Sequence, residues 1–362
     1  MDFLQFVRIN YGPLCNMKPD AFGILLNIPD KIILSYTYSI NLRKGDICMN
    51  SEWIEQLNSW HEEEQYERIA KQIEEIPASE RNYELTGQLA RAYNNLARYR
   101  EALELLLSTA SEGKEDYAWH FRLGYAYAHL AYYDKAISAF EQANRLHPED
   151  EHVQEFLSGF RPYAQKMEQD RQRYEQEAAL WKQQHGAQLP FDSFDLSDFW
   201  EESEYATENH IEPPFDEEII RSIEQKLGYK LPASYIALMH TQNGGFPTRT
   251  DFSTAEATSW SEHHIAITSI SGIGSQKAYS LTGEMGSRFM IEDWGYPDLG
   301  IVICDCPSAG HDVVMLDYRF CGPSGEPAVV HVDQEGGYEI TYLAPNFEAF
   351  ICGLVNAEEF DL

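Results

Sequence analysis

The feature that most constrains this chain is an internal repeat. The segment LARAYNNLARYREALELLL, which begins at Leu89, aligns with LGYAYAHLAYYDKAISAFEQANRLHP, which begins at Leu123, so the copies are offset by 123 − 89 = 34 residues. In both copies apolar residues recur at steps of three and four, which is the spacing of amphipathic helices. A period of this length indicates a solenoid of helical pairs, each stabilised by its neighbours. We therefore expect an all-α repeat domain over residues 49–185.

Both copies resemble the tetratricopeptide repeat. The match is carried in the second copy by Leu123, Gly124, Tyr127, Ala131, Tyr133, Ala136, Phe140, Ala143, Leu146 and Pro148. We expect a degenerate copy around Trp60 and Tyr66, and a polar helix over about 151–185 that caps the stack. Such arrays hold peptides or proteins on their concave face, and the resemblance implies a groove that is lined by Arg91, Asn94, Asn95, Tyr125 and His129. The alternative is that these side chains are merely solvated.

The charge of the chain restricts its partners. It has 27 basic and 59 acidic side chains, a formal net charge of −32. Such a field repels phosphate backbones and steers basic proteins, so we expect a basic protein partner and no nucleic acid. Plain solubility is the alternative reason for the acidity. No apolar run reaches the roughly 20 residues of a membrane helix, and the six cysteines have no disulfide-framework spacing. We expect a cytoplasmic protein that needs no cofactor.

Residues 1–48 lack the helical periodicity of the repeat domain. A purine-rich ribosome-binding sequence fits the codons of Lys44 to Asp46, and Met49 comes shortly after them. We hypothesise that translation begins at Met49 and that the leader is mis-annotated. A genuine disordered arm is the alternative.

An acidic connector is expected over residues 186–212. No Lys or Arg occurs between Gln183 and Ile220, a stretch in which aromatic residues alternate with carboxylates. A solvated linker would not carry so many aromatic rings. We therefore expect the connector to dock on the C-terminal domain by its rings, with its carboxylates outward. These carboxylates would form either a lure for a basic partner or only the surface of a docked linker.

From residue 213 to 362 the pattern predicts an α+β domain. Two short helices come first, with Asp216 as N-cap and Gly228 as stop, and five β-rich runs and a closing helix come after them. The stretches IEQKLGYKLPASYIALMHTQNGG and EDWGYPDLG, and a strand ending in LDY, resemble the Smi–Knr domain of the SUKH superfamily. The resemblance implies a mainly antiparallel sheet and non-enzymatic protein binding, either as an immunity protein against a toxin or as a scaffold-like regulator. The fused repeats raise the chance of an adaptor.

The stretch CDCPSAGHDVVMLDY, residues 304–318, combines residues that are typical of hydrolases and of metal sites. Ser308 lacks the G-x-S-x-G turn of a nucleophilic serine, which argues against hydrolysis. A zinc site is the better alternative, and its possible ligands are Cys304, Cys306, His311, Cys321 and His331. Because Cys-x-Cys lacks the usual gap of zinc sites, we predict no metal site and no catalytic residues, although metal binding by the cysteines stays open.

The same stretch is better interpreted as one arm of a hairpin. If the turn between VVMLDY and AVVHVDQ centres on Ser324, Asp317 lies opposite His331 and Met315 opposite Asp333. Asp317, His331 and Asp333 then share a polar face, and the valines point to the core. We expect a partner-binding surface made of Trp294, Tyr296, Asp298, His311, Asp312, Asp317, His331 and Asp333. The alternative is a structural network within the sheet.

Taken together, these patterns favour a non-enzymatic, intracellular bacterial binding protein. The most specific hypothesis is neutralisation of a basic toxin by surface occlusion. The runner-up is a regulatory adaptor whose repeats and C-terminal domain bind different partners.

Overall fold

The structure, a computed structural model, describes residues 51–186 and 188–360. The hypothesis about Met49 and the leader lies outside these residues. The chain divides into two compact units, the first of which ends at Glu168 while the second begins at Gln169. The first is all-α and the second is α+β, as the sequence predicts.

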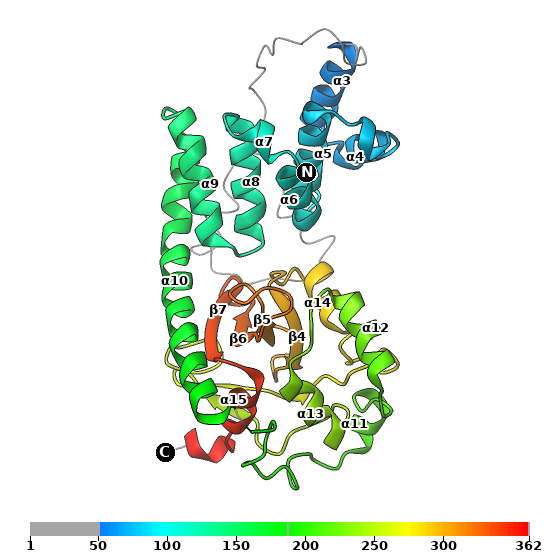
Figure 1. Ribbon diagram of the computed structural model, residues 1–362, viewed down its shortest axis with the longest axis vertical. Helices are drawn as coiled ribbons and strands as arrows, with labels where there is room; N and C mark the ends of the chain where they lie inside the picture. Colours follow the sequence, from blue (N-terminus) through cyan, green and yellow to red (C-terminus); the bar gives the residue numbers. More distant parts are fainter. Residues whose placement is uncertain (1–50, 187, 361–362) are drawn as a thin grey trace. The chain divides into compact units, whose positions relative to one another are not determined.

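The first unit is a series of antiparallel helical pairs (Figure 1). The turn of each pair places one residue in the left-handed region, and these residues are Glu64, Ala97 and Ala131, each with φ 57°. Their spacings are 97 − 64 = 33 and 131 − 97 = 34 residues, so the degenerate first copy is a true structural repeat. The helices are α3 (Ser51–Glu62), α4 (Tyr66–Glu74), α5 (Tyr83–Asn95), α6 (Tyr99–Ser108), a short α7 (Ala110–Gly113), α8 (Tyr117–His129) and α9 (Tyr133–Leu146), with a 3₁₀ turn (Ala78–Glu80) between α4 and α5.

Packing within and between the repeats also follows the period. A Cβ at Gly124 would lie 2.9 Å from the ring of Phe140, so glycine allows α8 and α9 to approach closely. The hydroxyl of Tyr83 donates to Asp116 at 2.6 Å, and 34 residues later the hydroxyl of Tyr117 donates to Asp150 at 2.5 Å. Adjacent repeats are therefore joined by the same charge-assisted bond.

The long helix α10 (Glu151–His185) contributes to both units. Its first turns place Phe156 and Phe160 against Phe140 in the repeat core. Beyond Gln169 the helix belongs to the second unit, where the hydroxyl of Tyr174 donates to the carbonyl of Glu326 at 2.7 Å. The boundary between the units therefore lies within α10, whereas the sequence pattern places it at residue 185. The second half of α10 is mostly polar, but its aromatic residue Tyr174 contacts the second unit.

The connector is part of the second unit. Phe191 and Phe199 are buried in its core, the indole of Trp200 donates to Thr241 Oγ1 at 2.8 Å, and the amide of Glu201 donates to the carbonyl of Phe246 at 2.8 Å. It also contains a short helix, α11 (Glu204–Asn209), which the sequence pattern does not predict.

From residue 213 onward, the two helices, the β-rich runs and the closing helix follow the predicted order, and the structure adds a helix at 287–292 that the sequence does not predict. Asp216 caps α12 by accepting from the amides of Glu218 and Ile219, each at 3.0 Å, and Gly228 ends it at φ 82°. The helices are α12 (Glu217–Leu227), α13 (Ala233–Thr241), α14 (Ser287–Glu292), α15 (Phe347–Cys352) and a final 3₁₀ turn (Ala357–Phe360). The strands are β1 (Asp251–Ser253), β2 (His264–Ala266), β3 (Ser269–Ile270), β4 (Gly300–Asp305), β5 (Asp312–Asp317), β6 (Ala328–Asp333) and β7 (Glu339–Ala344).

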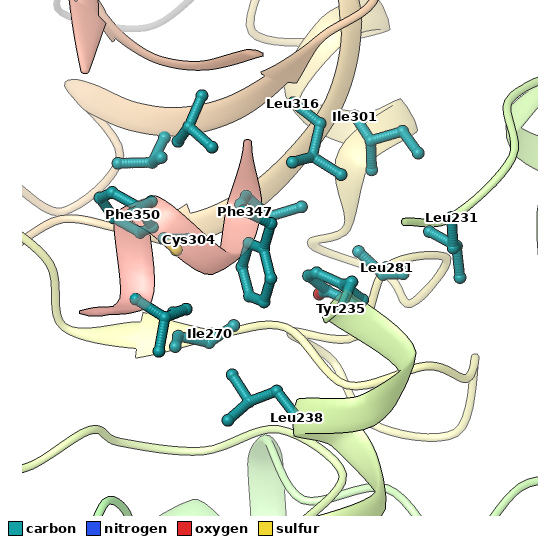
Figure 2. Packing of buried hydrophobic residues seen from close by; sticks show 14 of the residues in the cluster. Leu231, Tyr235, Leu238, Ile270, Leu281, Ile301, Cys304, Leu316, Phe347 and Phe350 are labelled. Atoms are coloured by element: carbon teal, nitrogen blue, oxygen red, sulfur yellow. The ribbon is translucent and has the colours of Figure 1, made fainter. Parts of the chain in front are cut away.

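The main sheet is antiparallel, in the order β3-β4-β5-β6-β7, and β1 pairs with β2 separately. Both faces of the main sheet are covered. On one face, Tyr235 of α13 and Phe347 and Phe350 of α15 pack against the strands, as Figure 2 shows. On the other, a smaller cluster contains Met290 of α14 and Val332 of β6. This double coverage leaves the loops at the strand ends as the exposed part of the sheet.

Candidate protein-binding surface

One end of the main sheet gathers three loops. The amide of Gln334, just after β6, donates to the carbonyl of His311, just before β5, at 2.8 Å. Asp333 ends β6 and accepts from the amide of Ser259 at 2.8 Å. The loops around residues 259, 311 and 334 are therefore bound to the same strand ends.

These loops, together with Trp294 just after α14, carry an exposed group of side chains, which we call the aromatic rim: Trp260, Trp294, His311 and Glu335. Trp260 is 43% exposed, and Trp294 and His311 are partly exposed and meet edge to face at 6.3 Å. Nδ1 of His311 lies 2.7 Å from Glu335 Oε1. An exposed tryptophan beside polar groups is typical of protein-binding surfaces. Trp260 is not among the residues that the sequence pattern predicts, although tryptophan in a polar loop is itself a signal.

Beneath the rim lies a buried polar cluster of Cys306, Asp312 and His331. Nε2 of His331 is 2.7 Å from Asp312 Oδ2, and both side chains are almost fully enclosed. The hydroxyl of Ser308 donates to Asp312, and the amide of Asp312 donates back to that oxygen at 3.0 Å. Burial, with the Asp312 charge as a lesser cause, raises the pKa of the Cys306 thiol well above its usual value. The cluster fixes the loop that carries His311.

This arrangement does not contain a nucleophile–base pair. Ser308 contacts the carboxylate of Asp312, and Asp312 in turn contacts His331. A catalytic serine needs the imidazole as its immediate neighbour, with the carboxylate on the far side of the ring. The geometry thus offers no hydrolytic triad in this stretch.

The predicted polar face of the hairpin is wrong. β5 and β6 pair Asp312 with Asp333, Val314 with His331 and Asp317 with Ala328, three positions away from the predicted register. His331 and Asp333 therefore share a face with Val314, whereas Asp317 lies on the other face. The turn centres near Gly322 rather than Ser324. The reason is that the segment between the strands spans 318–327 and so begins earlier than the sequence pattern suggests.

The structure places the predicted partner-binding residues at different depths. Trp294, Asp298 and His311 are partly exposed and stay candidates. Asp317 is fully buried and pairs with Arg319 at 2.7 Å. The side chains that are buried, and so offer no surface to a partner, are Tyr296, Asp312, Asp317, His331 and Asp333.

The connector forms a second surface, which we call the acidic strip. Its aromatic residues anchor it as described above, and all but one of its carboxylates point outward. Glu212 is the exception: it is 5% exposed and accepts from the amides of Gln276 and Lys277 and from the hydroxyl of Ser280. The exposed members in the connector are Asp192, Asp195, Asp198, Glu201, Glu202, Glu204 and Glu208, and the strip continues at the start of α12 with Asp216, Glu217 and Glu218.

In the repeat unit the predicted groove residues are largely engaged in contacts within the unit, some with each other and some with neighbouring residues. Asn94 is 5% exposed and donates to the carbonyl of Arg122 at 3.0 Å, and Asn95 donates to the carbonyl of Arg91 at 2.7 Å. His129 stacks on Tyr99 at 4.3 Å, and burial lowers its pKa to about 4. Tyr125 contacts the same histidine at 4.4 Å.

Two further residues, His61 and Arg122, belong with Arg91. Burial, and then the nearby charges of Arg91 and Arg122, lower the pKa of His61 to about 3. Burial and Arg122 likewise lower the pKa of Arg91 to about 9. Three successive inner helices thus bring the guanidinium groups of Arg91 and Arg122 close to the neutral imidazole of His61. Because they come from different repeats, no local sequence pattern reveals their proximity.

One comparison with known proteins identifies a family for part of the second unit. Residues 217–351 match the family model SUKH_6, described as SMI1-KNR4 cell-wall. No curated protein and no solved structure matches the chain. Among the helices in the described part of the chain, none is long and apolar enough to cross a membrane.

Proposed function

Because residues 217–351 form a SUKH domain of the Smi–Knr type, we propose that this protein is a non-enzymatic binding protein that neutralises a basic toxin by covering its surface. Members of this domain family act in toxin immunity or as regulators of the Smi–Knr kind. The repeats in front of the domain are consistent with a protein that works through protein contacts.

The observation that carries the proposal is the acidic strip. Its carboxylates are exposed along a segment without Lys or Arg, and Phe191 and Phe199 hold that segment on the domain. Because this segment is already folded, it does not lose the conformational entropy that a disordered acidic tail loses when it binds. A preorganised negative surface accelerates encounter with a basic partner and favours it over acidic competitors.

The aromatic rim supports the same function in a different way. Trp260 and Trp294 can bury apolar area against a partner, which the carboxylates cannot. Charge would then determine the rate of association, and the tryptophans the lifetime of the complex.

The test is capture of a basic partner from the native host's lysate by the tagged full chain, with washes at about 0.05 and 0.5 M salt, since salt screens exposed charges over this range. A triple variant, Glu201→Gln, Glu202→Gln and Glu204→Gln, should lose the partner at lower salt than the parent. The matched control, Glu55→Gln, Glu67→Gln and Glu104→Gln, removes the same charge from exposed positions of the repeat unit. Equal binding by both triple variants would refute the role of the strip.

An adaptor is the second candidate function, and the cationic cluster of the repeat unit favours it. Arg91 and Arg122 carry a charge opposite to that of the acidic strip, while His61 beside them is neutral near pH 7, so the two units suit partners of different kinds. An acidic partner that is retained by the full chain but lost with Arg122→Gln would support the adaptor. Retention of every partner by this variant would count against it.

A further inference from the structure

The cluster beneath the aromatic rim has a composition that its surroundings do not explain. Cys306, Asp312 and His331 are 3%, 2% and 0% exposed, and they lie beside a core cluster that is made of apolar side chains. Polar groups in such a place lower stability unless they are fully satisfied, and the bonds of Asp312 with His331 and Ser308 leave one nitrogen of His331 without a partner among the described residues. Their convergence therefore requires a reason beyond packing.

The antiparallel register explains how they meet. Asp305 pairs with Val313, so Cys306 and Asp312 stand at the two sides of the hairpin mouth. Val314 pairs with His331, and Asp312 precedes Val314 by two residues on the same face. Asp312 and His331 are thus diagonal neighbours on adjacent strands.

The donor atoms are close enough to surround one ion. One donor atom from each of the three side chains lies within 4.8 Å of the other two. Zinc ligands around a tetrahedral ion are separated by about 3.3–3.7 Å, as bond lengths of about 2.0–2.3 Å require. Small side-chain rotations would bring the three atoms to this spacing.

A second observation concerns the imidazole of His331. Its Nε2 faces Asp312, so a metal ion that is bound by both residues would take the place of this contact. Nδ1 is buried and has no hydrogen-bond partner among the described residues, so hydrogen bonding within the protein does not explain the burial of this ring.

We propose that Cys306, Asp312 and His331 form a zinc-binding site that holds the loop between β4 and β5 under the aromatic rim. A thiolate, a carboxylate and a neutral imidazole around a divalent ion give a site of zero net charge, which suits a buried position. Sulfur and imidazole ligands favour zinc over magnesium or calcium. Ser308, whose hydroxyl already contacts Asp312, stands where a fourth ligand or a water would complete the coordination.

Cys304 provides a matched control for the thiol. It lies near the end of β4, two residues before Cys306, is also buried and belongs to the same apolar cluster, but it is not part of the donor group. Cys304→Ser and Cys306→Ser therefore remove the same atom from similar surroundings, and only the second removes a proposed ligand.

The experiment measures metal content in the full chain, purified under reducing conditions without chelator and then loaded with zinc and desalted. We expect one zinc per chain for the parent and for Cys304→Ser, and a loss of affinity greater than about 100-fold for Cys306→Ser and His331→Gln, because even changes beyond the direct ligands cost about 10- to 100-fold. Substitution by Co²⁺ should give a sulfur-to-metal charge-transfer band in the parent and in Cys304→Ser.

The acidic surface of the protein binds metal ions weakly, and the design separates that from the proposed site. Less than a tenth of an equivalent in the parent, or equal zinc in the parent, Cys306→Ser and His331→Gln, would overturn the proposal. If Cys306→Ser does not fold, the cobalt spectrum of the parent decides: absence of the charge-transfer band at one equivalent of bound metal excludes the thiolate ligand.

Discussion

Phe199→Ala tests whether the connector is a folded part of the C-terminal unit. Phe199 is 0% exposed, packs edge to face against Trp200 at 4.9 Å and belongs to the same cluster as Tyr235 and Phe350. Removing a buried phenylalanine ring costs about 3–5 kcal/mol, which combines the lost transfer free energy with the cavity that is left. Since domains are stable by about 5–15 kcal/mol, this substitution should remove a large share of the stability of the unit.

The matched control is Phe194→Ala in the same segment, because Phe194 is only partly buried. It should cost about 1 kcal/mol, since less of its apolar area leaves water on folding. The two variants change the same residue type within the connector, so the difference between their losses in unfolding free energy reports the difference in burial.

The assay must report on one unit, because two units need not unfold together. Cys304 is fully buried in the C-terminal unit, so its modification by a thiol reagent in increasing urea, read by peptide mass spectrometry, measures the opening of that unit. A shift of less than about 1 kcal/mol for Phe199→Ala, equal to that of Phe194→Ala, would refute the view that the connector is docked.

Three further predictions concern packing and pH. Gly124→Ala should destabilise the repeat unit by about 1–3 kcal/mol, because the new Cβ would lie 2.9 Å from the Phe140 ring; an unchanged urea midpoint would mean that α8 and α9 are farther apart. Burial raises the pKa of Asp305 from 3.8 to about 6, so the folded state binds this proton more tightly and the C-terminal unit should lose up to about 3 kcal/mol as pH rises from 4 to 6. Asp305→Asn should remove this slope in urea titrations, and a slope that persists would contradict the assignment. The pKa of His129 is instead lowered from 6.5 to about 4, so the repeat unit should lose stability as pH falls through that range; His129→Phe should abolish the loss in thermal melts, and melts that match the parent would refute it.

Local signals in the sequence were sufficient for most of the elements. Asp216 and Gly228 mark the ends of α12 because capping depends on residues within one turn. The 34-residue period identifies the helical pairs because each pair repeats the same contacts, as Tyr83 and Tyr117 show. The five β-rich runs each contain a strand because β-branched residues in them fit a pleated, buried surface.

The site depended on features that sequence patterns do not encode. The register of β5 and β6 differs by three positions from the prediction, and an odd shift exchanges the two faces of one strand. Since both faces are buried, the alternation of polar and apolar residues that normally indicates register is absent from these strands.

The sequence by itself determined the helical repeats, the α+β class of the second unit and the aromatic anchoring of the connector, because these depend on periodicities and on residue types close in the chain. Only the tertiary structure decided that Cys306, Asp312 and His331 meet while Cys304 and Cys321 are not part of this group, and that Trp260 stands exposed. Such a meeting depends on strand pairing and loop closure between residues far apart in sequence, where a shift of one residue turns a side chain to the opposite face.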